Sequence, residues 1–183
     1  GASDSTQTIN LGSGDNTLIA HAGKSIITAG DGDNYMELYS YSEETKITAG
    51  NGDNEIKIAS ESTSGNLLYN IKLGNGNNNI YSINDDVVNV VAGYNIETGS
   101  GVDAINAGMH YCYWDASDSE NEHYVYSSID TGSGNDIITN SNYSTYDNFI
   151  NLTNDGDNEV VQTLTISGGE GNDTISSNYG VLK

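Results

Sequence analysis

The segment Ile47-Thr-Ala-Gly-Asn-Gly-Asp-Asn-Glu-Ile56 decides the fold, because its pattern returns along the whole chain. Two glycines stand two positions apart, an asparagine or aspartate follows two positions after the second glycine, and an aliphatic residue comes two positions later. Eight segments carry this pattern, the seventh with Asn154 in place of the first glycine: residues 9–18, 27–36, 47–56, 71–80, 96–105, 129–138, 151–160 and 166–175. Such self-similarity predicts a repeat architecture.

The spacing of the copies predicts a solenoid. The first residue of the glycine pair occupies positions 12, 30, 50, 74, 99, 132, 154 and 169, so successive copies lie 15 to 33 residues apart. Between the turns, short aliphatic and β-branched stretches with a period of two indicate half-buried strands, and no stretch shows sustained helical periodicity. We therefore expect an all-β fold, a parallel β-roll or β-solenoid of about eight coils with one glycine-rich turn per coil.

The domain organisation expected from this pattern is simple. Residues 1–8 form a lead-in, which begins with Gly1-Ala2-Ser3 as an expected cloning remnant, and residues 9–183 form a single β-roll domain. The longest step between copies predicts an insertion loop at residues 106–128.

Composition excludes several classes of function. The chain carries 26 acidic residues against five lysines and no arginine, for a net charge of −21. It therefore lacks the cations that bind nucleic acid, and it has no basic patch for an anionic membrane. No apolar run reaches the length of a membrane-spanning helix, so membrane insertion is not expected. The single cysteine, Cys112, excludes an internal disulfide framework.

The turn chemistry points to a hard cation. Closely spaced glycines permit left-handed backbone and expose carbonyl oxygens, while the following aspartate or asparagine adds a side-chain oxygen. Stacked turns bring these oxygens together, and an all-oxygen cage suits Ca²⁺ better than Mg²⁺ or a soft metal. Stacked acidic turns also repel one another and call for a neutralising cation. A hydrogen-bonded asparagine ladder that needs no metal is the alternative, and the sequence leaves both open.

One copy carries a family signature. The run Ser167-Gly-Gly-Glu-Gly-Asn-Asp-Thr-Ile175 contains Gly-Gly-x-Gly-x-Asp-x-aliphatic. It resembles the glycine-rich nonapeptide of RTX (repeats-in-toxin, haemolysin-type) calcium-binding proteins. The resemblance implies a parallel β-roll that binds several Ca²⁺ ions, with the sixth residue of each nonapeptide as a ligand, helped by turn carbonyls.

Carried over to this chain, the resemblance implies three metal-site positions in each turn. The sixth-position residues are Asn16, Asn34, Asn54, Asn78, Asp103, Asp136, Asn158 and Asp173. The associated turn residues are Gly12, Gly14, Gly30, Gly32, Gly50, Gly52, Gly74, Gly76, Gly99, Gly101, Gly132, Gly134, Asn154, Gly156, Gly169 and Gly171.

This chain departs from the family pattern in two ways. Five of the eight sixth positions hold asparagine, which lowers the expected affinity, and four of these follow an aspartate that could be the ligand instead: Asp15, Asp33, Asp53 and Asp157. The motif also recurs once per coil, so only one edge of the roll is expected to carry a regular row of sites.

The insertion at 106–128 and the other return turns are rich in tyrosine, including Tyr39 and Tyr41. The insertion also holds the only tryptophan, Trp114. These aromatics are either a cover for the edge of the roll or a platform for a partner such as a glycan.

The function expected from these features is that of a calcium-binding RTX-like module in a larger secreted or cell-surface bacterial protein. The parent protein would be an adhesin, a toxin or an exoenzyme, and the module would be monomeric and fold on calcium binding outside the cell. The alternative is a module that binds a glycan or a cell-surface protein through the tyrosine-rich variable edge. A polysaccharide-acting enzyme is a third class, and we expect no enzymatic activity, because few cations accompany the acids.

Overall fold

The computed structural model describes residues 6–40, 44–60, 65–83, 90–107, 124–140 and 161–177. Within these ranges the chain forms strands and turns without a helix, as the sequence predicts, and therefore no helix there could cross a membrane. The strands are β1 (Gln7–Gly12), β2 (Thr17–Ala22), β3 (Ser25–Ala29), β4 (Tyr35–Ser40), β5 (Glu44–Thr48), β6 (Glu55–Ser60), β7 (Gly65–Lys72), β8 (Asn79–Ile83), β9 (Val90–Glu97), β10 (Ala104–Asn106), β11 (Tyr124–Asp130), β12 (Ile137–Asn140), β13 (Val161–Ser167) and β14 (Thr174–Ser177).

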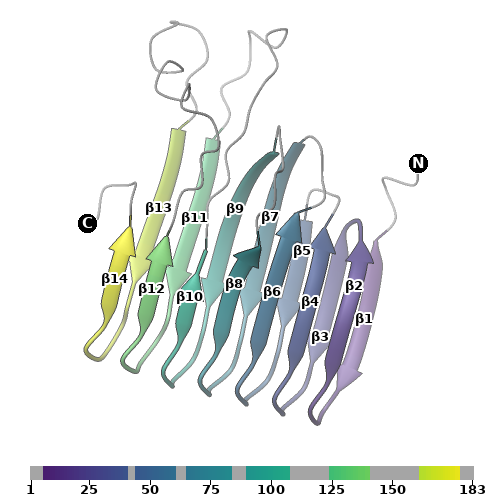
Figure 1. Ribbon diagram of the computed structural model, residues 1–183, viewed down its shortest axis with the longest axis horizontal. Helices are drawn as coiled ribbons and strands as arrows, with labels where there is room; N and C mark the ends of the chain where they lie inside the picture. Colours follow the sequence, from purple (N-terminus) through teal and green to yellow (C-terminus); the bar gives the residue numbers. More distant parts are fainter. Residues whose placement is uncertain are drawn as a thin grey trace, which may run out of the picture.

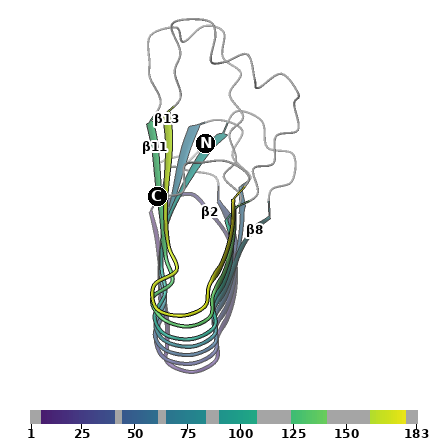
Figure 2. The same ribbon diagram turned by 90° about the vertical axis from the view of Figure 1, so that its left-hand side faces the viewer.

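The strands form two parallel sheets of seven. The odd-numbered strands make one sheet in the order β1-β3-β5-β7-β9-β11-β13. The even-numbered strands make the other in the order β2-β4-β6-β8-β10-β12-β14. Figure 1 shows the strands stacked side by side, with the glycine-rich turns along the lower edge. Figure 2 shows the two sheets facing each other, joined by these turns. Each winding is thus one odd strand, one glycine-rich turn and one even strand, which is the arrangement of a parallel β-solenoid.

The described residues contain seven windings, whereas the sequence predicts about eight. The copy at 151–160 lies outside the described residues. On either side of it, β12 pairs directly with β14, with Ile137 opposite Thr174, and an isolated bridge joins Ser133 to Glu170. The turn at 132–136 therefore stacks directly on the turn at 169–173.

The core lies between the two sheets and consists mainly of stacked aliphatic side chains, with the stacked pair Tyr69 and Tyr94 among them. In the odd sheet, Ile27, Ile47, Ile71, Ile96 and Ile129 stand in register, and all five are at most 2% exposed. A matching row in the even sheet contains Met36, Ile56, Ile80, Ile105 and Ile138. Burying each such side chain contributes roughly 1.5–3 kcal/mol. The parallel register follows from this alternation, since a slip of one residue would turn every aliphatic side chain outward.

Two expectations about the variable edge need correction. The insertion at 106–128 is shorter than predicted, because Asn106 ends β10 and the segment from Tyr124 to Ser128 belongs to β11, which pairs with β13. Tyr39 lies within β4 on the sheet and not in a return turn, because the alternating pattern of β4 continues to its end. Residues 108–123, with Cys112 and Trp114, lie outside the described residues, as do Tyr41, Tyr143 and Tyr146.

Candidate site at the glycine-rich turns

Glycine is required in these turns because neighbouring turns touch. Gly52 has a φ of 134°, in the left-handed region that other residues avoid. A Cβ at Gly52 would also overlap the carbonyl oxygen of Gly32 in the preceding turn. The N–H of Gly52 donates to the carbonyl of Asn75 in the following turn at 2.8 Å. The turns therefore form a continuous hydrogen-bonded spine, and in every described turn after the first there is no space for a side chain at the second glycine.

The predicted sixth-position residues point into the solenoid and form a ladder. The side chains of Asn34, Asn54, Asn78 and Asp103 are at most 1% exposed. The amide nitrogen of each asparagine donates to the side-chain oxygen of the next turn: Asn16 to Asn34 at 2.8 Å, Asn34 to Asn54 at 2.8 Å, Asn54 to Asn78 at 2.9 Å and Asn78 to Asp103 at 2.9 Å. These turns thus adopt the asparagine ladder, the alternative that the sequence left open.

The same asparagines also donate hydrogen bonds to the turn carbonyls that were predicted to be metal ligands. The amide nitrogen of Asn34 donates to the carbonyl of Gly32 at 2.8 Å, and that of Asn54 donates to the carbonyl of Gly52 at 2.9 Å. A cation in these turns would face N–H groups and would have to displace them. The asparagine turns therefore fit a metal poorly, and we do not extend the calcium prediction to them.

The aspartates that precede the asparagines play a different part. Asp15, Asp33 and Asp53 are exposed on the outside of the turns. A carboxylate oxygen of Asp15 accepts from the main-chain N–H of Asp33 at 2.9 Å, and Asp33 accepts in the same way from Asp53 at 2.8 Å. Asp53 accepts from the N–H of Asn77 at 2.7 Å. These side chains form a second ladder on the outside of the turns and are not directed at the inner ladder of sixth-position side chains.

The row changes character at its C-terminal end, where aspartate replaces asparagine. Oδ1 of Asp103 accepts from the main-chain N–H and the side-chain amide of Asn78, at 2.8 and 2.9 Å, and its Oδ2 accepts from the Thr98 hydroxyl at 2.7 Å. Oδ1 of Asp136 accepts from the N–H of Asp103 at 2.9 Å. Oδ2 of Asp136 is buried and has no hydrogen-bond partner among the described residues. Asp173 closes the row by accepting from the N–H of Asp136 at 3.0 Å.

The aspartate end is rich in acceptors and poor in donors. An ionised carboxylate has no hydrogen to give, so the carbonyls of Gly101 and Gly134 lose the donor that each asparagine turn supplies. Burial raises the pKa of Asp103, the donors from Thr98 and Asn78 lower it in part, and the neighbouring Asp136 raises it further. Two carboxyl groups are thus buried one strand apart, and among the described residues Asp136 receives fewer donors than Asp103.

Sequence reasoning missed the two threonines that accompany this change. The position before the first glycine is apolar in the asparagine windings, namely Leu11, Ala29, Ala49 and Leu73. It is Thr98 and Thr131 in the two windings with buried aspartates, and both threonines are buried. The Thr131 hydroxyl donates to the carbonyl of Gly168 at 3.3 Å instead of to Asp136. In the six copies between residues 9 and 138, threonine and aspartate change together, whereas the copies with Asn158 and Asp173 have Thr153 and Gly168 at this position.

The oxygen set at the aspartate end fits a hard cation. It combines carboxylates, threonine hydroxyls and turn carbonyls, which are the donor types that Ca²⁺ takes. Among the described residues, no three acidic, histidine or cysteine side chains are grouped so as to hold a metal, so a cation here would depend on main-chain oxygens as well. The predicted site residues Asn154, Gly156 and Asn158 lie outside the described part of the chain. Comparisons with models of protein families, with curated proteins and with solved structures gave no match.

Proposed function

We propose that the chain is a calcium-dependent structural module, a β-roll of the RTX type, in a larger secreted or cell-surface bacterial protein. The resemblance of the glycine-rich turns to the RTX nonapeptide supports the family, and the parallel two-sheet fold agrees with it. Calcium binding belongs to the C-terminal aspartate turns, while the N-terminal asparagine turns are a scaffold that needs no metal. The module itself has no catalytic role in this proposal.

One observation carries the calcium assignment. Oδ1 of Asp136 accepts a main-chain N–H as Oδ1 of Asn78 does, so its Oδ2 takes the place of an asparagine amide nitrogen, and this atom is buried without a partner among the described residues. Leaving a buried polar group unpaired costs about 1–3 kcal/mol, and more when the group is charged. Asp136 and Asp173, with the turn carbonyls of Gly132 and Gly134, would hold the cation, which would supply the missing positive charge.

The proposed location outside the cell follows from the weakness of such a site. Few of its ligands are charged, and sites of this kind in extracellular modules have dissociation constants of about 10⁻⁴–10⁻³ M. They are filled where calcium is millimolar. Because binding energy adds to folding energy, calcium would complete the folding of the C-terminal windings there.

Calcium titration by calorimetry tests this assignment with a matched pair of variants. Asp136→Asn restores the amide of the asparagine ladder at the same size, so we expect it to remove calcium binding without unfolding the protein. Asn54→Ala changes the same row in an asparagine winding and should leave the calcium stoichiometry unchanged, provided that circular dichroism shows it folded. Equal calcium binding by the wild type and Asp136→Asn would contradict the assignment.

A further inference from the structure

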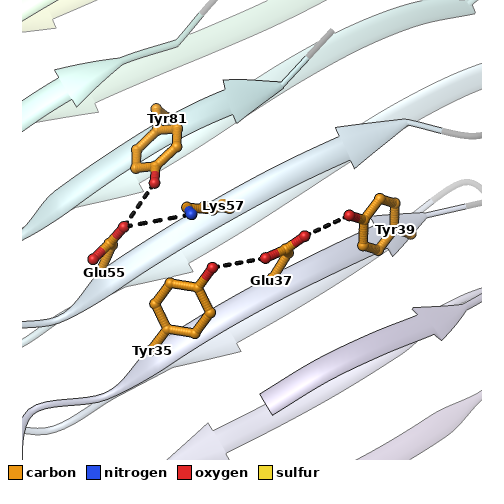
Figure 3. Close-up of polar contacts among 6 residues, drawn as sticks. All are labelled: Tyr35, Glu37, Tyr39, Glu55, Lys57 and Tyr81. Atoms are coloured by element: carbon orange, nitrogen blue, oxygen red, sulfur yellow. Dashed lines mark hydrogen bonds and ion pairs between the residues drawn. The ribbon is translucent and has the colours of Figure 1, made fainter. Parts of the chain in front are cut away.

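A cluster of tyrosines and charged residues lies on the outward face of the even sheet, away from the buried row. We call it the tyrosine face, and it consists of Tyr35, Glu37 and Tyr39 on β4, Glu55 and Lys57 on β6, and Tyr81 on β8 (Figure 3). The register places Tyr35 opposite Glu55 and Lys57 opposite both Glu37 and Tyr81. All six side chains are partly exposed, so they form a surface that a partner can reach.

The tyrosine rings are held in place by the carboxylates between them. The hydroxyls of Tyr35 and Tyr39 both donate to Glu37, the first at 2.7 Å, and the hydroxyl of Tyr81 donates to Glu55 at 2.6 Å. Aromatic side chains that are already fixed lose little conformational entropy when they bind a ligand. In Figure 3 the rings of Tyr35 and Tyr81 turn their broad sides toward the viewer, who looks onto the face of the sheet.

The face extends to the neighbouring strand β2 through His21. The imidazole ring of His21 stacks on Tyr39, with 4.3 Å between ring centroids and 4° between ring planes. Aromatic rings thus lie on β2, β4 and β8 of one continuous sheet. This arrangement suits an extended ligand that crosses several strands.

Lys57 neutralises part of the negative charge of this face. Its ammonium group lies 4.9 Å from the ring centroid of Tyr35 and 5.4 Å from that of Tyr81, and 3.8 Å from a carboxylate oxygen of Glu55. Hydrogen bonds with Tyr35 and Tyr81 raise the pKa of Lys57, and those from Tyr39 and Tyr35 lower the pKa of Glu37. Both groups therefore keep their charges at neutral pH, which suits binding rather than proton transfer.

The fold does not require this cluster. In the C-terminal windings of the same sheet, the outward positions hold smaller residues without an aromatic ring: Ala104, Asn106, Ile137, Thr139, Thr174 and Ser176. These windings stack in the same register as the others. The sheet therefore does not need the tyrosine face of the N-terminal windings in order to stack its strands.

We propose that the tyrosine face binds an uncharged polysaccharide chain. The flat aromatic rings offer stacking surfaces for the apolar C–H faces of sugar rings, and the carboxylates, tyrosine hydroxyls and ammonium group around them offer partners for sugar hydroxyls. The face carries two carboxylates and one ammonium within a chain of net charge −21, so an anionic polymer would be repelled. A linear glycan lying across β4, β6 and β8 would contact Tyr35 and Tyr81 together.

Affinity electrophoresis of the full chain in millimolar calcium tests this inference. The gels contain hydroxyethylcellulose, laminarin, xyloglucan or galactomannan as uncharged probes, and alginate as an anionic probe. We expect at least one uncharged probe to retard the protein, and we expect Tyr35→Ala and Tyr81→Ala each to weaken that binding about tenfold. Tyr35→Phe keeps the ring and should keep most of the binding.

Thr139→Ala on β12 is the matched control, because it changes the same sheet outside the tyrosine face. Its binding should stay within about twofold of the wild type, and circular dichroism establishes that each variant is folded. The inference is overturned if no uncharged probe retards the wild type, if alginate alone does, or if the folded tyrosine variants bind as the wild type does.

Discussion

The sixth-position side chains from Asn16 to Asp173 form one row, the buried row, whose two ends share the same backbone turns but differ in hydrogen bonding. Asn16 begins the row as a donor, and the side chains of Asn34, Asn54 and Asn78 each accept from one neighbouring turn and donate to the other. From Asp103 to Asp173, the side chains only accept, and Oδ2 of Asp136 has no partner among the described residues. The comparison shows that a glycine-rich turn does not by itself make a metal site. The side chain at the sixth position decides whether the turn supplies its own donor or requires a cation.

The largest effect on stability should come from replacing a buried asparagine of the row by aspartate. Asn54→Asp places a charge in a fully buried row and removes the donor to Asn78. We expect a loss of roughly 3 kcal/mol or more in unfolding free energy, measured by denaturant in EDTA. Asn77→Asp is the control, because residue 77 is exposed and accepts only a main-chain N–H, which aspartate also accepts. Equal losses for the two variants would show that a charge in the buried ladder costs no more stability than a charge at the exposed position 77.

The reverse exchange should stabilise the protein when calcium is absent. Asp136→Asn removes the buried unpaired oxygen and restores a donor toward the turn carbonyl of Gly134. We expect a gain of about 1–3 kcal/mol in EDTA, measured by the same denaturant titration. A loss of stability in EDTA would mean that the protein already stabilises the Asp136 carboxylate without a cation. The proposed difference between the asparagine part and the aspartate part of the row would then be wrong.

A smaller effect is expected at Thr98, whose hydroxyl donates to Asp103. Thr98→Val keeps the shape of the side chain and removes this charge-assisted hydrogen bond. We expect a loss of about 1.5–3 kcal/mol at neutral pH, at the lower end of this range because Asn78 still donates to Asp103. In an Asp103→Asn background the loss should shrink, since no charge remains. A loss of the same size in both backgrounds would indicate a packing effect.

The smallest expected effect is a pH dependence of stability at the aspartate end. Burial raises the pKa of Asp103 above its ordinary value of 3.8, so the folded state holds this proton more tightly than the unfolded state. The resulting stability is present below pH 3.8 and is lost as pH rises through the raised pKa. Melting temperatures in EDTA should therefore fall with rising pH more steeply for the wild type than for Asp103→Asn. Parallel curves would contradict this.

The fold could be predicted from the sequence because the determinants are local and repeated. Glycines at fixed spacing define the turns, and alternating aliphatic residues define the strands. The copy at 151–160, with Asn154 in place of the first glycine, lies outside the described residues, and the pattern did not predict that β12 pairs directly with β14.

The site was predicted less completely than the fold. The difference between asparagine and aspartate turns was visible, but whether an asparagine faces a cation or its neighbour depends on side-chain direction. The tyrosine face was missed because its members come from three strands. Tyr35, Glu37 and Tyr39 alternate on one strand, yet only the register brings Lys57 and Tyr81 beside them.

Amide hydrogen exchange, followed turn by turn in EDTA and in millimolar calcium, tests the central claim most directly. The main-chain N–H of Asn54 donates to the side-chain oxygen of Asn78, whereas those of Asn78, Asp103 and Asp136 donate to the carboxylates of the aspartate part. We predict that calcium increases the protection of Asp103 and Asp136 strongly and leaves Asn54 nearly unchanged. An equal increase in all the turns, or no change at Asp103 and Asp136, would contradict the division of the row into a self-sufficient part and a cation-dependent part.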